Sequence, residues 1–134
     1  MSVFVDTAAL YALLVETEEE HDAVAAEFRR LVDLGRRLVT SNYVLVETAA
    51  VLQARFGLAP VRDLDAHFVP LLDVQWVSKQ LHRLAMDRLV KADLRELSLV
   101  DCSSFELMDA GGIKDAFTLD EDFATQGYRV LPRL

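Results

Sequence analysis

The sequence predicts an α/β fold, a three-layer α/β/α sandwich with a central, mainly parallel sheet of about five strands. Short runs rich in valine, leucine and phenylalanine alternate along the chain with longer segments whose apolar residues recur at helical spacing. Strands that alternate with helices in this way form parallel sheets covered by helices on both faces. A length of 134 residues, 52% of them hydrophobic, suits one domain with a substantial core and leaves little room for a second.

The first strand and two helices are expected before residue 36. Residues 2–6 are a β-rich run that ends on an aspartate, and residues 7–15 continue at helical spacing. Residues 18–35 have the pattern of an amphipathic helix. This segment has acidic residues at its start, arginines near its end and a closing glycine, which is the charge order that the helix dipole favours.

A second strand and a long helix follow. Residues 37–41, with the sequence RLVTS, predict the strand. Ser41 or Asn42 then caps the helix, because either side chain can accept a hydrogen bond from a free backbone N–H of the first turn. That helix is expected to stop near Gly57, since glycine is the usual residue just beyond a helix end.

The middle of the chain predicts two helices around a third strand. Residues 59–72 favour a helix that Pro70 must end or kink, because proline lacks a backbone N–H. Residues 74–78 predict the strand, in which Trp76 is expected to pack in the fold or in an interface. Residues 79–92 then recur at helical spacing.

The C-terminal part completes the predicted sheet. Residues 98–112 begin on a serine with Asp101 three positions later, a capping-box pattern, and end on two glycines that favour a helix terminus. Residues 115–120 predict the fourth strand, residues 121–127 one or two helical turns, and residues 128–132 the fifth strand.

The charge balance argues against a protein that binds nucleic acid through a basic surface. Fourteen lysines and arginines stand against 22 acidic residues, a formal net charge of −8, whereas phosphate contacts are normally supplied by lysine and arginine. Acidic groups gathered at one metal site would produce such an excess without governing the rest of the surface. The basic residues of segments 28–37 and 79–91 fit either a solvated helix face or a phosphate track.

Other totals exclude several classes of protein. A single cysteine, Cys102, excludes an internal disulfide framework and the usual zinc cage, and is expected to be a small buried apolar residue. No apolar run approaches the roughly 20 residues of a membrane span. The N-terminus lacks the basic start of a secretory signal, so a cytoplasmic location is expected.

Glu47 is the most unusual acidic residue, because its neighbours at helical spacing are all of low polarity. They include Val44 and Val51, which predicts that Glu47 lies on the apolar stripe that enters the core. A lone buried carboxylate costs several kcal/mol unless it is protonated, paired or bound to a metal. A buried salt bridge to Arg55 is the best structural alternative to a metal-binding role.

Three further acids have ordinary explanations when each is taken alone. Asp6 and Asp120 follow predicted strands and could cap the next helix, while Asp101 could complete its capping box. Asp6 and Asp120 also fall where ligands bind in open parallel sheets, at the carboxyl ends of the strands, whereas Asp101, like Glu47, has apolar neighbours in the sequence. One divalent cation would account for them and for Glu47 together, because Mg²⁺ and Mn²⁺ prefer carboxylate oxygens. Such a site commonly activates water for attack on a phosphate.

Four linked segments carry a family resemblance: VFVDTAAL, TSNYVLVET, LSLVDCSSFELM and AFTLDEDFATQGYRVLP. In order and spacing the chain resembles PIN-domain proteins, and in particular the VapC-type toxin ribonucleases of VapBC toxin–antitoxin systems. The resemblance implies that residues 1–134 form a single PIN-like domain with Mg²⁺-dependent, or Mn²⁺-dependent, endoribonuclease activity. It also implies an RNA substrate, a small VapB-like antitoxin as partner, and a homodimer.

The family's acidic quartet maps onto residues of this chain. The implied catalytic and metal-binding residues are Asp6, Glu47, Asp101 and Asp120. The resemblance gives Thr118, two positions before the last acid, a supporting role through hydrogen bonding to a carboxylate. The chain departs from the family where EDF follows Asp120, since related chains commonly carry a basic residue or histidine there. Either Asp120 or the supporting Asp122 could therefore be the working acid.

Two other functions compete with the nuclease. An inert PIN-fold module that acts through protein or RNA contacts remains open, because the acids after the fourth strand add negative charge where RNA would approach. A phosphatase of the haloacid dehalogenase type also uses an acid after its first strand. It needs a second aspartate two residues later, where this chain has Ala8.

Overall fold

Five parallel strands form one sheet in the order β3-β2-β1-β4-β5 in a computed structural model that describes residues 1–134. The strands are β1 (Ser2–Val5), β2 (Arg37–Ser41), β3 (Asp73–Gln75), β4 (Asp115–Phe117) and β5 (Arg129–Leu131). Because β1 pairs with both β2 and β4, the first strand of the chain lies in the centre of the sheet. Because all five strands are parallel, their carboxyl ends lie at the same edge of the sheet, and Asp6 follows β1 at that edge.

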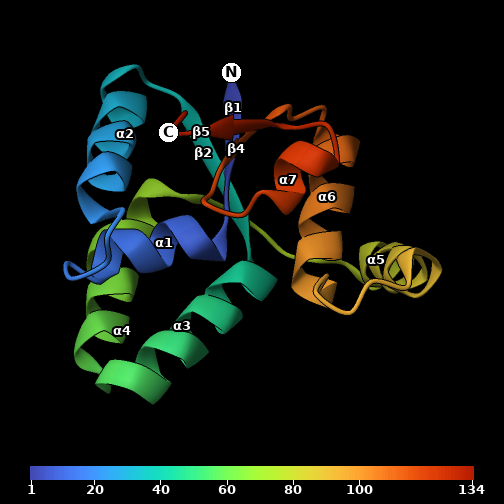
Figure 1. Ribbon diagram of the computed structural model, residues 1–134, viewed down its shortest axis with the longest axis horizontal. Helices are drawn as coiled ribbons and strands as arrows, with labels where there is room; N and C mark the ends of the chain where they lie inside the picture. The colour runs from blue at the N-terminus through green and yellow to red at the C-terminus, as the bar shows by residue number, and fades with distance from the viewer.

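Helices cover both faces of this sheet, which confirms the predicted three-layer fold. The helices are α1 (Thr7–Leu14), α2 (His21–Asp33), α3 (Asn42–Phe56), α4 (Ala59–Asp63), α5 (Lys79–Ala92), α6 (Leu99–Gly111) and α7 (Asp122–Thr125). Figure 1 shows α1, α2 and α4 on one side of the strands, with α5 and α6 on the other. No helix in this fold combines the length and the apolar composition needed to cross a membrane.

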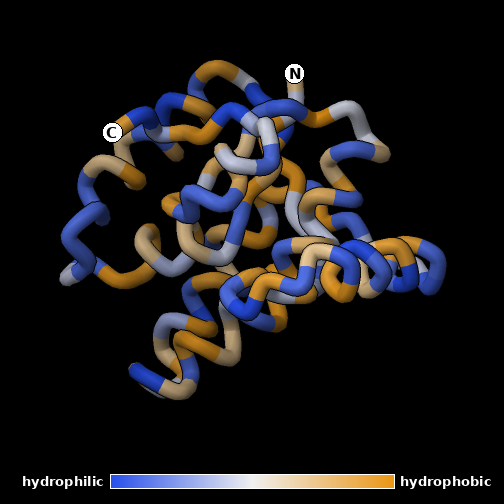
Figure 2. The backbone as a smooth tube through the Cα atoms, turned by 45° about the vertical axis from the view of Figure 1, so that its right-hand side comes forward, coloured by the Kyte–Doolittle hydropathy of each residue, from blue (hydrophilic) through white to orange (hydrophobic).

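The core lies between the central strands and the inner faces of the helices. Val3, Phe4 and Val5 of β1 are all buried, as expected for a strand covered on both faces. Phe117 of β4 and Phe105 of α6 are also fully buried. Each such side chain stabilises the fold by roughly 1.5–3 kcal/mol. In Figure 2 hydrophobic and hydrophilic residues alternate along the helices, because one face packs inward and the other meets solvent.

Serine caps set three of the helix starts. Ser41 accepts a hydrogen bond from the backbone of Val44 at 3.1 Å and so begins α3. Ser78 caps α5 in the same way, because its side chain accepts a hydrogen bond from the backbone N–H of Leu81. Ser98 and Asp101 form the expected capping box at the start of α6. Asp101 is thereby placed in the first turn of a rigid helix.

The segment between α3 and β3 differs from the single helix that residues 59–72 predict. After α4 the chain continues through a wider π-helical segment (Leu64–Phe68) and then a tighter 3₁₀ turn (Val69–Leu71). Pro70 lies in the 3₁₀ turn, where its missing N–H prevents α-helical continuation. The third strand also ends earlier than predicted, at Gln75, so that Trp76 is 79% exposed rather than packed in the sheet.

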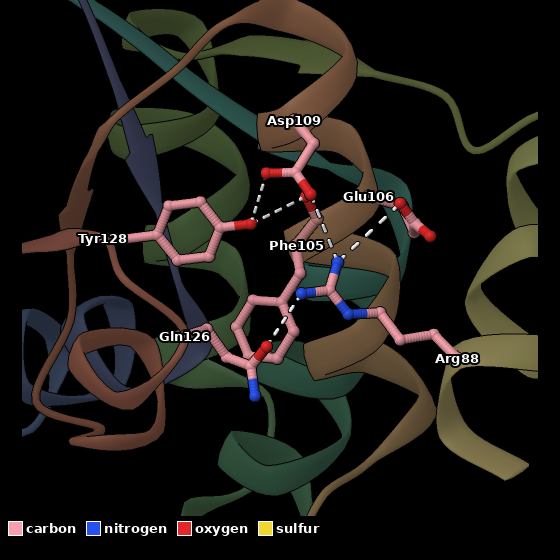
Figure 3. Close-up of polar contacts among 6 residues, drawn as sticks. All are labelled: Arg88, Phe105, Glu106, Asp109, Gln126 and Tyr128. Atoms are coloured by element: carbon pink, nitrogen blue, oxygen red, sulfur yellow. Dashed lines mark hydrogen bonds and ion pairs between the residues drawn. The ribbon is translucent and has the colours of Figure 1, made fainter. Parts of the chain in front are cut away.

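A polar network holds α6 against α5 and against the segment that leads into β5 (Figure 3). Arg88 of α5 lies 3.3 Å from Asp109, donates to Gln126 at 2.8 Å, and places its guanidinium 4.9 Å from the ring centre of Phe105. The hydroxyl of Tyr128 lies 2.6 Å from Asp109 on the same helix. These contacts fix the orientation of α6, whose other end carries Asp101.

Candidate metal centre

Asp6 lies at the carboxyl end of the central strand and is only 3% exposed. It occupies the N-cap position of α1, yet its side chain makes no capping hydrogen bond. Its Oδ2 instead accepts a hydrogen bond from the Thr118 hydroxyl at 2.8 Å. The pKa of Asp6 is raised from 3.8 to about 7, mainly by burial; hydrogen bonds from Thr118 and from the Thr7 backbone act in the opposite direction, and the negative charges of Asp101 and Asp120 add to the rise.

Thr118 joins the two strand ends that carry acids. Its hydroxyl donates to Asp6 and accepts a hydrogen bond from the backbone N–H of Asp120 at 3.0 Å. Thr118 is fully buried, and its own backbone N–H donates to Leu131 of the neighbouring strand. Because its position is fixed on both sides, this residue sets the spacing between Asp6 and the turn after β4.

Asp101 reaches the same region from the first turn of α6. Its Oδ2 accepts a hydrogen bond from the backbone N–H of Ser98 at 3.1 Å, so the carboxylate is oriented by the capping box. Partial burial raises the pKa of Asp101, and the charges of Asp120 and Glu47 raise it further. Asp101 can therefore both cap α6 and belong to the site, because the carboxylate that completes the capping box also lies near other acids.

Glu47 does not enter the core, so that expectation is wrong. The buried face of α3 is formed by Val44, Thr48 and Leu52, and Glu47 lies partly exposed beside it. The apolar neighbours were misleading because α3 is apolar on its solvent side too, where Val46 is 68% exposed. The alternative of a buried salt bridge is also wrong, since no ion pair joins Glu47 to Arg55.

One pocket of about 330 Å³ is lined by five acids from separate parts of the chain. Its acidic lining residues are Asp6, Glu18, Glu47, Asp101 and Asp120. In Figure 1 the N-terminal ends of α1, α3 and α6 lie near one another at the ends of the strands. The fold thus brings the four predicted acids to one place and adds Glu18, from the turn after α1.

Asp122 belongs to a second, overlapping group. Carboxylate oxygens of Asp101, Asp120 and Asp122 all lie within 4.8 Å of one another, close enough to hold one ion. The backbone N–H of Asp122 donates to Asp120 at 2.9 Å. Partial burial and the charge of Asp120 raise the pKa of Asp122. Asp122 does not line the pocket that contains Asp6, whereas Asp120 belongs to both groups.

The donor atoms fit a hard divalent cation. The pocket is lined by carboxylates and by Thr7, with no histidine or cysteine, and such oxygen donors suit Mg²⁺ or Mn²⁺ rather than Zn²⁺. The Thr7 hydroxyl is buried without a hydrogen-bond partner in the protein, as expected of a group that contacts an ion's water shell. Clustered carboxylates repel one another, and a cation would offset that repulsion.

Three lining residues were missed as site residues by the sequence reasoning. Thr7 directly follows Asp6, so adjacency to a candidate ligand was an available signal. Glu18 lies in a turn and carries no signal of its own. Arg55 entered only as a partner for Glu47, although two turns of one helix separate them. It lines the same pocket but bonds to the Tyr11 hydroxyl at 2.8 Å.

Comparisons with known proteins agree with the fold. Residues 3–127 match the family described as PIN domain. The 23S rRNA-specific endonuclease VapC20 of Mycobacterium tuberculosis is 37% identical over 92 residues, which are 68% of this chain and 70% of that protein. The crystal structure of Mycobacterium tuberculosis VapC20, described as a Sarcin-Ricin loop cleaving toxin, matches with a TM-score of 0.81 at 34% identity. That match covers 95% of this chain and 96% of the other.

Proposed function

The chain belongs to the PIN domain family, and on that premise we propose that it is a metal-dependent endoribonuclease, the toxin of a VapBC-type toxin–antitoxin pair. Its proposed substrate is a structured loop of ribosomal RNA, because the VapC20 relatives are described as a 23S rRNA-specific endonuclease and a Sarcin-Ricin loop cleaving toxin. An RNA substrate of this kind would place its action in the cytoplasm.

The convergence of Asp6, Glu47, Asp101 and Asp120 on one pocket carries this proposal. These residues come from four different elements, so no local requirement of a helix or strand brings them together. Gathering like charges destabilises a fold unless something binds them. A site that accepts this cost is typical of a metal centre, and a phosphodiester hydrolase is the common use of such a centre.

The proposed roles of the side chains follow from how each is held. The four acids would hold Mg²⁺ or Mn²⁺, which when bound supplies an activated water and charge stabilisation at the attacked phosphate. Thr118 holds Asp6 and the Asp120 turn at a fixed spacing. Ser98 orients Asp101. Asp122 supports Asp120 through its backbone N–H. Hydrolysis by in-line attack of water would leave a 3′-hydroxyl and a 5′-phosphate.

The partners of the proposed toxin are a VapB-like antitoxin and a second copy of the chain. Large apolar side chains at the surface support association with other proteins, because such groups gain stability when covered. Val46 of α3, Trp76 after β3 and Val90 of α5 are 68%, 79% and 70% exposed. We propose that contacts of this kind form the homodimer and receive the antitoxin.

Substitution of two acids tests the assignment. Purified wild type, freed of any antitoxin, is incubated with a sarcin–ricin stem-loop RNA in Mg²⁺ and in Mn²⁺, and metal binding is followed by calorimetry. Asp6→Asn and Asp101→Asn should each lose cleavage while keeping a cooperative unfolding transition. Full cleavage by both variants would remove these residues from the mechanism.

The same experiment decides between the nuclease and the inert module. A folded, antitoxin-free wild type that neither binds divalent metal nor cuts RNA would contradict the nuclease proposal. The acidic residues after the fourth strand, including Glu121 and Asp122, are the feature that favours this second candidate, because they repel an approaching RNA backbone.

A further inference from the structure

Arg55 is the one basic residue among the twelve that line the acidic pocket. It lies in the last turn of α3, eight residues after Glu47, which corresponds to about 12 Å along the helix axis. The pocket therefore has an acidic end at the strand termini and a basic end between α1 and the last turn of α3.

The guanidinium of Arg55 is held by an aromatic residue and not by a carboxylate. Its Nη1 donates to the Tyr11 hydroxyl at 2.8 Å, and its central carbon lies 5.4 Å from the centre of the Tyr11 ring. No acid lies within ion-pair distance of Arg55, although five acids line the same pocket. Most of its donor groups thus remain free, since a guanidinium has five N–H donors.

The structural role of Arg55 accounts for only part of this arrangement. A cation in the last turn of a helix interacts favourably with the helix dipole. Stacking against Tyr11 also stabilises the packing of α1 on α3 by about 0.5–1 kcal/mol at an exposed site. Neither effect requires the free N–H groups to line a pocket that ends in the candidate metal ligands.

We propose that Arg55, positioned by Tyr11, binds a backbone phosphate of the RNA next to the scissile one. The proposal rests on the proposed nuclease function and adds a substrate-binding residue to it. With the scissile phosphate at the acidic end, the chain of a polyanion that continues along the pocket meets Arg55 with an adjacent phosphate. Arginine suits this role because its planar fork donates two parallel hydrogen bonds to phosphate oxygens. On a chain of net charge −8 it would also offset the repulsion from Glu18 and Glu47.

Kinetics of cleavage test the proposal with Arg55→Gln, Arg55→Lys and Tyr11→Phe. The control is Arg36→Gln, which removes one positive charge at the opposite, amino-terminal edge of the sheet, next to β2. Initial rates on a sarcin–ricin stem-loop RNA are measured between about 50 and 200 mM salt, because affinity that depends on phosphate contacts falls strongly across this range. Mn²⁺ affinity is measured by calorimetry in every variant.

Arg55→Gln should raise KM about tenfold, the effect of losing one charge-assisted hydrogen-bonded contact, with kcat and Mn²⁺ affinity near wild type. The slope of log KM against log salt should fall by about one, because one phosphate contact is lost. Arg55→Lys should restore the salt slope but only part of the KM, since lysine keeps the charge and loses the fork. Tyr11→Phe should raise KM by a smaller factor, and Arg36→Gln should match wild type.

Several outcomes would overturn the assignment. Wild-type KM and salt slope in Arg55→Gln would show that no phosphate contact is made, and a fall in kcat alone would place Arg55 elsewhere in the reaction. Loss of antitoxin binding with unchanged KM would make Arg55 a protein contact. Failure of the wild type to cut RNA would refute the nuclease itself. In that case, equal RNA affinities of wild type and Arg55→Gln in a binding titration would refute the phosphate contact separately.

Discussion

Replacing Asp6 by asparagine should stabilise the metal-free protein above neutral pH. Asparagine has nearly the same shape, and its carbonyl oxygen can accept the Thr118 hydrogen bond that the carboxylate accepts at 2.8 Å. The charges of Asp101 and Asp120 disfavour the ionised Asp6 carboxylate, and this repulsion does not act on a neutral amide. The substitution therefore removes a buried negative charge without removing the hydrogen bond.

The magnitude follows from the pKa of Asp6, which burial raises from 3.8 to about 7. Between these values the folded protein keeps a proton that the unfolded chain has lost. The free energy of unfolding must then fall as pH rises from about 4 to about 7, and level off above. At about 1.4 kcal/mol per pH unit, ionised Asp6 destabilises the metal-free fold by up to about 4 kcal/mol at pH 8.

Urea unfolding of wild type and Asp6→Asn in chelator, at pH 4 and at pH 8, measures this difference. The two proteins should have similar unfolding free energies at pH 4, and the variant should be about 2–4 kcal/mol more stable at pH 8. Saturating Mn²⁺ should reduce or reverse the gap, because the ion binds the wild-type site and stabilises the folded state. A gap that does not change between the two pH values would refute the assignment of a raised pKa to Asp6.

Three further substitutions have distinct expected outcomes. Thr118→Val, which removes the hydroxyl that joins Asp6 to the Asp120 turn, should lower Mn²⁺ affinity by about 10–100-fold in calorimetry, as is typical when a group that orients a ligand is lost; unchanged affinity would show that the acids do not need this support. Glu47→Gln should weaken Mn²⁺ binding but change the unfolding free energy by less than about 0.5 kcal/mol, because the side chain is partly exposed and unpaired. A large loss of stability would contradict the partly exposed position of Glu47. Arg88→Gln should lower the unfolding free energy by about 1–3 kcal/mol in urea, since it breaks the network of Figure 3 and leaves Asp109 without its cation; wild-type stability would show that the network does not hold α6.

The sequence predicted the limits of a strand or helix correctly where a particular residue, such as a capping serine, sets those limits. The predicted strand 37–41 and helix 79–92 match β2 and α5 residue for residue. Ser41 ends the strand by capping α3, and Ser78 caps the start of α5. The strand predicted over 115–120 is shorter, and β4 ends at Phe117. Thr118 still donates its backbone N–H to Leu131, but the N–H of Asp120 donates to the Thr118 hydroxyl and that of Asp122 to the Asp120 carboxylate, so the chain turns away from the sheet here.

The sequence by itself determined the fold class and the resemblance to PIN-domain proteins, and it named the four acids that the structure brings to one pocket. Each of these depends on residue type and spacing along the chain: alternating strands and helices, capping residues, and carboxylates that follow strands or have apolar neighbours. The family match over residues 3–127 confirmed the resemblance.

Only the tertiary structure decided the direction in which Glu47 faces, the partner of Arg55, and the second acidic group that includes Asp122. A helix such as α3, apolar on both its buried and its exposed side, has no pattern in sequence that identifies its inner face. The rotation of that helix is set by what packs against it, and distances between carboxylates from separate elements depend on where the sheet places those elements. Both are long-range properties, so they exist only once the chain has folded.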